Sequence, residues 1–440
     1  MNTGPARGMR DFLPEDVRRR QYVIGVIADV YQKYGFEPLE TPAVENIETL
    51  QGKYGEEGDR LIFKILKRGE GAETGQADMA LRYDLTVPLA RVVAEYRAKL
   101  PKFFKRYQVQ PVWRADRPQK GRFREFYQCD VDAIGSKAPV VEAELCNAVS
   151  DVLLRLGFSD FELVINHRRL LTGILNGTGV APDQHAEALV ALDKIDKVGV
   201  EGAEKDLIAR GFEQATAQRL LGIIGAPPHA DWLAWLEQQM PLDDDGRAGV
   251  ENLREILRLT KQTSAGAHIK VEPSLARGLG YYTGAIFEIK VKDLAGSLGG
   301  GGRYDDLVGM FSGEQVPAAG FSLGLERILV VMGERAMFPP DLATTPADVM
   351  VAVWNAEQIA DLLQLAASLR AAGLRVEMYP EADKVGKQFK YASARNIPFV
   401  AVIGDEELAN GTVAVKNMKS GEQAAYPRAT VAAQIKSVIK

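Results

Sequence analysis

Basic side chains are concentrated between residues 102 and 124, where the sequence could bind phosphate groups. Eight lysine and arginine residues stand there against one acid, Asp116, whereas a normal solvated surface intersperses both signs. The guanidinium fork of arginine matches a phosphate, and at roughly 1.5–3 kcal/mol per charge-assisted bond a polyphosphate needs two or three arginines. The alternative to phosphate binding is that these cations lie on an edge hairpin and protect it from aggregation. The eight are Lys102, Lys105, Arg106, Arg114, Arg117, Lys120, Arg122 and Arg124.

Acidic side chains on neighbouring segments could form the other end of a binding site. Asp84, in RYDLT, precedes a predicted helix. Asp130 and Asp132 alternate with Val131, so on a strand their side chains point to one face together with Gln128. A face of acids and an amide could bind a cationic amine. A solvated outer face of the same strand is the alternative.

An arginine stands inside a segment whose composition predicts a strand. Residues 274–287 read SLARGLGYYTGAIF, and the aliphatic and aromatic residues from Leu275 to Phe287 favour a half-buried strand. Arg277 must be paired there, because an unpaired charge in a sheet interior is costly. Its partner is an internal carboxylate or a bound anion. Arg327, which ends GFSLGLER at the start of an apolar helix, has the same two alternatives.

The gross composition excludes several classes of protein. With 440 residues, 46% of them hydrophobic, and a net charge of -5, the chain can form two or three domains and lacks the basic character of a chromatin protein. No apolar run approaches ~20 residues, so we expect no membrane span. Two cysteines favour a reducing compartment, and we expect a cytoplasmic protein. The four histidines have no ligand spacing, so no protein-bound metal is expected.

The elements that must position these residues are predicted from periodicity and from turn-forming residues. A helix begins near Pro14, and the strand FEPLETPAVE is interrupted by Pro38 and Pro42, which suits a sheet edge. The runs KRYQVQPVWRADR and GRFREFYQCDVDAIG predict a hairpin joined by RPQKG. A helix near 140–156 follows the hairpin.

Changes of pattern along the sequence divide the chain into five parts. Residues 1–167 and 269–336 predict two parts of one sheet domain, separated by a helical insertion at 168–268. A proline-containing linker at 337–346 precedes a small α/β domain at 347–440, for which we expect mostly parallel strand pairing.

Five segments in order resemble the histidyl-tRNA synthetase family of class II aminoacyl-tRNA synthetases. They are RGMRDFLPED, FEPLETP as motif 1, WRADRPQKGRFREFYQ as motif 2, SLARGLGYYTGAIFEI as the histidine signature, and AAGFSLGLERIL as motif 3. The resemblance implies an α+β fold with an antiparallel-sheet catalytic core and a C-terminal α/β domain that binds the anticodon. It also implies a homodimer formed through motif 1, and an ATP-dependent ligase that joins L-histidine to the 3′ end of tRNA(His).

The resemblance implies how ATP is bound. Arg114 is expected at the α-phosphate, Arg327 at the γ-phosphate and Glu125 near the adenine. Arg277 is expected at the α-phosphate, where other class II enzymes place a magnesium ion. These three arginines are the expected catalytic residues. Magnesium is expected only as a ligand of ATP, and no tightly bound cofactor is expected.

The resemblance also assigns the polar residues around the amino acid and the tRNA. The expected histidine-binding residues are Asp84, Thr86, Gln128, Asp132, Arg277, Tyr281, Tyr282 and Tyr304. The acceptor end of the tRNA is expected to face Arg117, Gln119 and Lys120. The cations expected to contact tRNA from the C-terminal domain, or else to form a solvated helix face, are Lys384, Lys387, Lys390 and Arg395. Gly280 departs from the family, which usually has aspartate at this position.

One relative of this family has a different function and is the alternative. It is the synthetase-like regulatory subunit of ATP phosphoribosyltransferase, which binds histidine without aminoacylating tRNA. That subunit typically lacks the C-terminal α/β domain and the arginine of the histidine signature. Both are present in this sequence, which favours the ligase.

Overall fold

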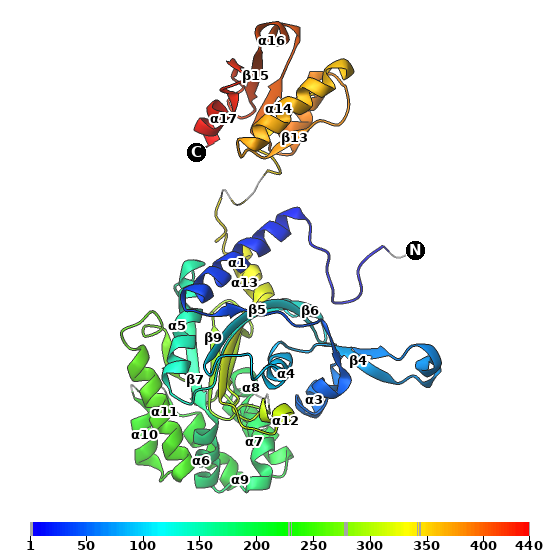
Figure 1. The fold of residues 1–440 in the computed structure, drawn as a ribbon. Helices are drawn as coiled ribbons and strands as arrows, with labels where there is room; N and C mark the ends of the chain where they lie inside the picture. Colours follow the sequence, from blue (N-terminus) through cyan, green and yellow to red (C-terminus); the bar gives the residue numbers. More distant parts are fainter. Residues whose placement is uncertain are drawn as a thin grey trace. The chain divides into compact units, whose positions relative to one another are not determined.

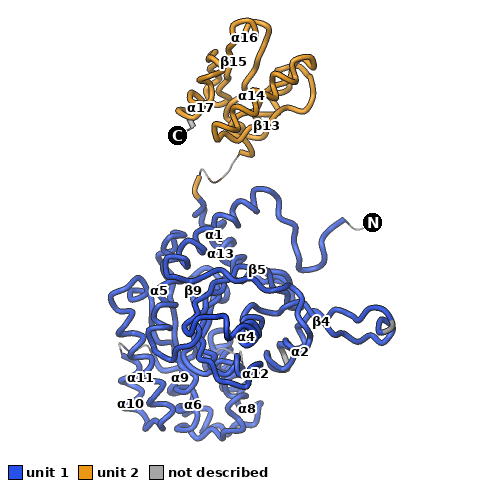
Figure 2. The backbone as a smooth tube through the Cα atoms, in the orientation of Figure 1, with its two compact units in different colours: residues 1–338 blue, residues 339–440 orange. Residues whose placement is uncertain are grey.

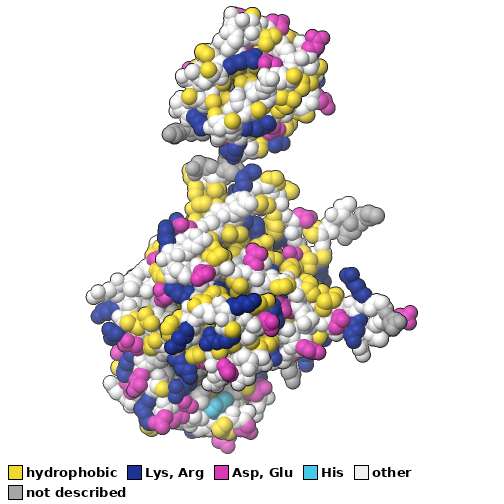
Figure 3. Space-filling model, in the orientation of Figure 1, with side chains coloured by type: hydrophobic (Ala, Val, Ile, Leu, Met, Phe, Trp, Pro, Cys, Tyr) yellow, Lys and Arg dark blue, Asp and Glu magenta, His cyan; other side chains and the backbone are white. Residues whose placement is uncertain are grey.

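The computed structural model describes residues 3–227, 229, 231–276, 280–340, 342 and 345–439. Two compact units, residues 1–338 and 339–440, are coloured separately in Figure 2. Acidic and basic side chains are interspersed on the visible face of the first unit (Figure 3). No helix within the described ranges is long and apolar enough to cross a membrane.

An eight-stranded sheet forms the centre of the first unit, in the order β1-β5-β6-β11-β10-β9-β7-β8. Its pairings are antiparallel except for β1 with β5 and β7 with β8, which confirms the antiparallel α+β core. The proline-containing strand β1 lies at the sheet edge, as predicted. The strands are β1 (Glu37–Pro38), β5 (Phe104–Trp113), β6 (Glu125–Ile134), β7 (Glu162–His167), β8 (Ile269–Val271), β9 (Ala285–Lys290), β10 (Ser297–Arg303) and β11 (Ala318–Gly324).

One face of this sheet is apolar and is covered by helices. The helices α1 (Pro14–Lys33), α5 (Val140–Arg155) and α13 (Leu325–Glu334) pack on it (Figure 1). Val131, Phe321 and Phe287 lie in one row across the strands and point into this core. The start of α1 at Pro14 confirms the predicted helix, since proline fits the first helical turn and acids follow it.

The opposite face carries polar residues and glycines at the alternating positions. Asp130 and Asp132 of β6 pair in register with Ser322 and Gly320 of β11. A Cβ atom at Gly320 would lie 1.9 Å from Oδ1 of Asp132, so only glycine leaves room for that carboxylate. Period-2 alternation therefore builds a polar floor on the side away from the core.

The predicted hairpin is confirmed, but the predicted strand from Leu275 is wrong. β5 and β6 pair along their whole length, whereas β9 begins only at Ala285. Before it the chain leaves the sheet, and the Tyr281 hydroxyl reaches Asp84. Gly284 permits this path, because a Cβ there would lie 2.9 Å from the side chain of Arg303. Residues 277–279 fall outside the described residues, so the prediction for Arg277 does too.

The first unit also contains a small sheet, which is ordered β2-β4-β3. Figure 1 shows α4 on the side of the main sheet opposite α1 and α13. These remaining elements are β2 (Val44–Asn46), α2 (Ile47–Leu50), α3 (Gly55–Arg60), β3 (Lys64–Leu66), the 3-10 helix Gly69–Thr74, β4 (Ala77–Leu81), α4 (Thr86–Glu95) and α12 (Gly309–Ser312).

Between β7 and β8 the described residues form only helices. They share one hydrophobic core with the sheet, in which Leu170 and Leu253 pack with Leu163, so contacts do not separate them from the first unit. The division at 168 and 268 therefore stays a prediction. The helices are α6 (Arg168–Thr178), the 3-10 helix Pro182–Gln184, α7 (His185–Leu192), α8 (Ile195–Ala209), α9 (Gln214–Ile224), α10 (Trp232–Gln239) and α11 (Asp244–Thr260).

The second unit is an α/β domain with a mixed sheet, ordered β13-β12-β14-β15-β16. Pairing is parallel only on the two sides of β12, so the expectation of mostly parallel pairing is wrong. A parallel crossover needs a dozen or more residues, and only 403–411 connect β14 to β15. The elements are β12 (Val349–Val351), the 3-10 helix Ala356–Gln358, α14 (Ile359–Ala371), β13 (Val376–Met378), α15 (Val385–Ala394), β14 (Phe399–Val402), α16 (Asp405–Asn410), β15 (Thr412–Asn417), β16 (Gln423–Pro427) and α17 (Val431–Ile439).

Candidate active site

A cavity of about 830 Å³ lies over the polar floor of the eight-stranded sheet. This volume suits a small substrate together with a nucleotide. Glu125, Arg117 and Lys120 do not line it, and Arg277 lies outside the described residues. The predicted residues that the cavity brings together are Asp84, Thr86, Arg114, Gln119, Gln128, Asp132, Tyr281, Tyr282, Tyr304 and Arg327.

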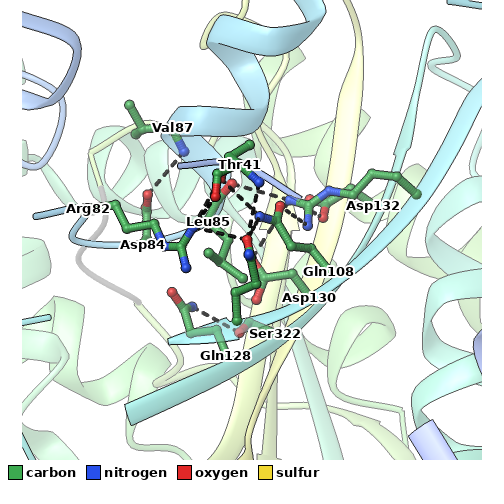
Figure 4. Close-up of polar contacts among 12 residues, drawn as sticks. Thr41, Arg82, Asp84, Leu85, Val87, Gln108, Gln128, Asp130, Asp132 and Ser322 are labelled. Atoms are coloured by element: carbon green, nitrogen blue, oxygen red, sulfur yellow. Dashed lines mark hydrogen bonds and ion pairs between the residues drawn. The ribbon is translucent and has the colours of Figure 1, made fainter. Parts of the chain in front are cut away.

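Asp84 is fixed at one end of the cavity by three hydrogen bonds. Its Oδ1 accepts from the Tyr54 hydroxyl at 3.0 Å. The same oxygen accepts from the backbone N–H of Val87 at 3.0 Å (Figure 4). Its Oδ2 accepts from the Tyr281 hydroxyl at 3.4 Å. Burial raises the pKa of Asp84, although the hydrogen bonds and the charge of Arg114 oppose that shift. The carboxyl is therefore held in one orientation at the start of α4.

Gln128 and Asp132 continue this acidic end along β6. The Gln128 amide donates to the Ser322 hydroxyl at 2.9 Å, and the Tyr304 hydroxyl donates to Asp132. Asp132 is only 2% exposed, which rules out a solvated outer face for it. Burial raises the pKa of Asp132, and burial together with the neighbouring carboxylates raises the pKa of Asp130 to about 7, against the influence of Arg106.

Arg106 belongs to this acidic end, so its expected role in phosphate binding is wrong. Its guanidinium is fully buried and lies 2.9 Å from Asp132, 3.1 Å from the Gln108 side chain and 3.4 Å from the Leu85 carbonyl. The sequence signal was its register position: in a hairpin joined by a short loop, residue 106 pairs with residue 132. Lys105 likewise binds another side chain of the protein, because it donates a hydrogen bond to Glu144.

The cationic end of the cavity is formed by Arg114 and Arg327. Arg114 donates to the Tyr83 carbonyl at 3.0 Å, and its guanidinium lies 4.3 Å from the centre of the Tyr83 ring. Arg327 donates to the backbone carbonyls of Gly121 and Ser297. These bonds fix the orientation of both guanidiniums, and both side chains line the cavity.

The N-terminal segment supports an aromatic wall next to this cationic end. Phe123 lines the cavity, and the Arg10 guanidinium lies 3.3 Å from the centre of its ring. Arg10 is 3.9 Å from Glu326, which also binds Arg20 and the backbone N–H of Tyr127. No role was predicted for Arg10, Phe123 or Glu326, although all three lie in segments that resemble the family.

No group of three or more His, Cys, Asp or Glu side chains within the described ranges is arranged to bind a metal ion. Asp84 is already bound by Tyr54, and Asp132 by Arg106 and Tyr304. The cationic end instead suits an anion that brings its own metal ion.

The same fold occurs in solved structures with different printed functions. An ATP phosphoribosyltransferase regulatory subunit/histidyl-tRNA synthetase from Bacillus halodurans matches with a TM-score of 0.72 and 20% identity, over 89% of this chain and 97% of that one. At that identity the likeness shows the fold alone. A histidyl-tRNA synthetase from Nostoc sp. matches with a TM-score of 0.83 and 30% identity over the whole of both chains.

Sequence comparison is more specific. Residues 8–328 match the family model described as Histidyl-tRNA synthetase, and residues 348–438 match the one described as Anticodon binding domain. A histidine–tRNA ligase of Porphyromonas gingivalis is 43% identical, with 98% of each chain covered. One from Gloeobacter violaceus is 38% identical, with 97% of each covered. Motif 2, the histidine signature and motif 3 all contribute residues to one cavity, and the chain belongs to the histidyl-tRNA synthetase family.

Proposed function

We propose that this protein is a histidine–tRNA ligase that works in two steps. The carboxylate oxygen of L-histidine attacks the α-phosphorus of ATP, the bond to the β-phosphate breaks, and histidyl-adenylate and pyrophosphate form. The terminal ribose hydroxyl of tRNA(His) then attacks the acyl carbon, and AMP leaves. The observation that carries the proposal is one cavity lined by a buried floor of acids and an amide and by two oriented arginines.

The acidic end would bind the histidine. Its α-ammonium fits Asp84 and Gln128, and its ring fits Asp132, whose other neighbours are Arg106 and Tyr304. A site built to hydrogen-bond a polar substrate rejects analogues without that group by ~10⁴–10⁵, so selection needs no editing step. Thr86 and Tyr282 complete the lining, and Tyr281 acts by fixing Asp84.

The cationic end would bind ATP. A carboxylate that attacks a phosphate is repelled anion to anion, and fixed cations remove that repulsion. We assign the α-phosphate to Arg114 and the γ-phosphate to Arg327. From the family resemblance alone we keep Arg277 as a further α-phosphate ligand. Magnesium would arrive on the outer phosphates. The nucleophile is already an anion, so the step needs no protein base. A role for Glu125 at the adenine has no support from the cavity lining.

We expect residues of both units to contact the tRNA. Gln119 lines the cavity and would face the acceptor end with Arg117 and Lys120. In the second unit, Lys387 is paired with Asp383 and Arg395 with Glu377, which leaves the solvated-face alternative open for these two cations. We further propose a homodimer through the edge strand β1 and the residues that follow it.

Two assays test the function. With purified protein, histidine should drive exchange of pyrophosphate into ATP, and tRNA(His) should become charged with histidine. A regulatory subunit would bind histidine and do neither. Histidine binding without exchange or charging would therefore replace this proposal by that alternative.

A further inference from the structure

Asp130 is a carboxyl on the cavity floor to which none of the roles above is assigned. It is 2% exposed and lines the cavity. It follows Gln128 and precedes Asp132 at alternating positions of β6, and Ser322 of β11 is its register partner. Figure 4 shows these side chains on one side of the sheet.

Oδ1 of Asp130 and Oε1 of Gln128 are buried and accept no hydrogen bond from the described residues. Oδ2 of Asp132 accepts none either, but it lies 2.9 Å from the Arg106 guanidinium. A buried acceptor without a donor carries its full desolvation penalty, and native proteins contain few of them. Because the Asp130 and Gln128 side chains line the cavity, the donor they fit is a group of the substrate.

Arg106 does not satisfy Asp130, because it is committed to Asp132. Its nearest guanidinium nitrogen is 2.9 Å from Asp132 and 3.9 Å from Asp130. Gln108 accepts from Arg106 at 3.1 Å and is itself held by the Thr41 hydroxyl at 3.0 Å (Figure 4). This chain of hydrogen bonds keeps the guanidinium on the Asp132 side.

Two buried carboxyls therefore lie beside one guanidinium, which contacts only Asp132 closely. Burial is the largest cause that raises the pKa of Asp130 to about 7; Arg106 and a hydrogen bond from Ser322 oppose it, and the charges of Asp132 and Asp84 add to it. From β11 only the uncharged Ser322 faces this carboxyl in register. Burial of two neighbouring carboxyls therefore favours a proton held by the pair.

We propose that Asp130 is a specificity-determining contact to the imidazole of the substrate, binding one ring nitrogen while Asp132 binds the other. A neutral imidazole has one N–H donor and one bare nitrogen acceptor. A carboxylate accepts from the N–H, and a protonated carboxyl donates to the bare nitrogen. A carboxyl pair that holds one proton therefore satisfies both nitrogens. This inference rests on the proposed function, because it takes histidine as the ligand.

Three variants isolate the role of Asp130. Asp130→Asn keeps its size and an N–H donor but cannot titrate, whereas Asp130→Ala removes the contact. Asp306→Asn is the matched control, since Asp306 is exposed and does not line the cavity. Exchange kinetics and calorimetric binding of histidine are measured between about pH 6 and pH 8.5, the range that brackets histidine-like pKa values. The thiophene analogue β-(2-thienyl)alanine supplies a ring of similar size without nitrogen.

The expected effects fall on histidine and not on ATP. Asp130→Ala should raise KM and Kd for histidine about 100-fold, with KM for ATP changed less than about twofold, and should reduce discrimination against the thiophene analogue. Histidine should bind the wild-type protein more weakly as pH rises above neutrality, because Asp130 then loses the proton it donates. Asp130→Asn should lack this step, and the control should behave as the wild type.

Each opposite result overturns the inference. The inference is wrong if Asp130→Ala binds histidine within about twofold of the wild type, or if its KM for ATP rises as much as its KM for histidine. It is also wrong if the pH dependence of histidine binding is unchanged in Asp130→Asn. If Asp130→Ala does not fold, the pH profile of the isosteric asparagine variant decides. Absence of exchange in the wild type would refute the proposed ligase, whereas calorimetry would still decide the role of Asp130.

Discussion

At the acidic end of the cavity, Asp84, Asp130 and Asp132 are each 2% exposed, whereas at the cationic end the Arg122 side chain is 47% exposed and Arg114 and Arg327 are half-buried. The acids are held by tyrosine hydroxyls, a backbone N–H and a buried arginine. The arginines are held by backbone carbonyls and aromatic rings.

The difference follows from what each end must bind. Histidine is small and must be separated from nineteen other amino acids, so its polar contacts have to be desolvated and preorganised. A triphosphate carries a large charge and its own metal ion, so the arginines can bind it without being fully desolvated. Substitutions at the two ends should therefore divide cleanly between histidine and ATP parameters.

Asp84→Ala should have the largest effect. Removing a buried charge partner should lower kcat/KM for histidine about 10³-fold and leave KM for ATP nearly unchanged. Tyr54→Phe removes only one of the hydrogen bonds that hold Asp84 and should cost about 10-fold. Steady-state exchange at varied histidine and ATP checks both. A comparable rise in KM for ATP would break the proposed division.

Arg114→Ala should act at the other end. We expect kcat for exchange to fall about 10²–10³-fold, because a fixed cation is lost where charge develops, while histidine still binds. Arg122→Ala is the control within the same cavity, since Arg122 is neutralised by Asp116 and should matter much less. Calorimetry with histidine accompanies the exchange assay. Equal losses in the two variants would contradict the role given to Arg114.

Arg10→Gln should raise KM for ATP and not KM for histidine. The Arg10 guanidinium supports the Phe123 ring, and a cation–π contact of this kind corresponds to roughly a two- to thirtyfold effect. Arg10→Lys keeps a cation over the ring and should recover part of the loss. A lysine variant no better than the glutamine variant would show that the contact is not electrostatic.

The smallest effect should be on the stability of the unliganded protein. Asp130 has an elevated pKa of about 7 when folded, against an ordinary value of about 3.9, so the folded state holds an extra proton between these values. Stability from this group is present at low pH and is lost as pH rises through about 7. The difference between the Tm of Asp130→Asn and the Tm of the wild type should therefore rise, in favour of the variant, from pH 5 to pH 8. A constant Tm difference would contradict the shifted pKa.

Local pattern in the sequence predicted much of the catalytic sheet. Alternation along residues 128–132 placed Gln128, Asp130 and Asp132 on one face, and the proline in β1 placed that strand at the edge. The pairing of Arg106 with Asp132 was missed, because counting charges in a segment ignores the face on which each lies. Hairpin register would have shown it.

Other parts of the site depend on contacts that are distant in the sequence. The hydrogen bond from Tyr281 to Asp84 spans 197 positions, and it accompanies a chain path that leaves the predicted strand before Ala285. The stacking of Arg10 on Phe123 likewise joins the N-terminal segment to the motif 2 hairpin. Periodicity carries no information about such contacts.

The most direct test of the account is pyrophosphate exchange measured with each of the twenty amino acids in turn. A cavity with this buried acid and amide floor beside aimed arginines should support exchange with histidine alone, at least ~10⁴-fold above any other amino acid. Exchange with none of the twenty, or with a different amino acid, would contradict the assignment of the cavity as a histidine-activating site.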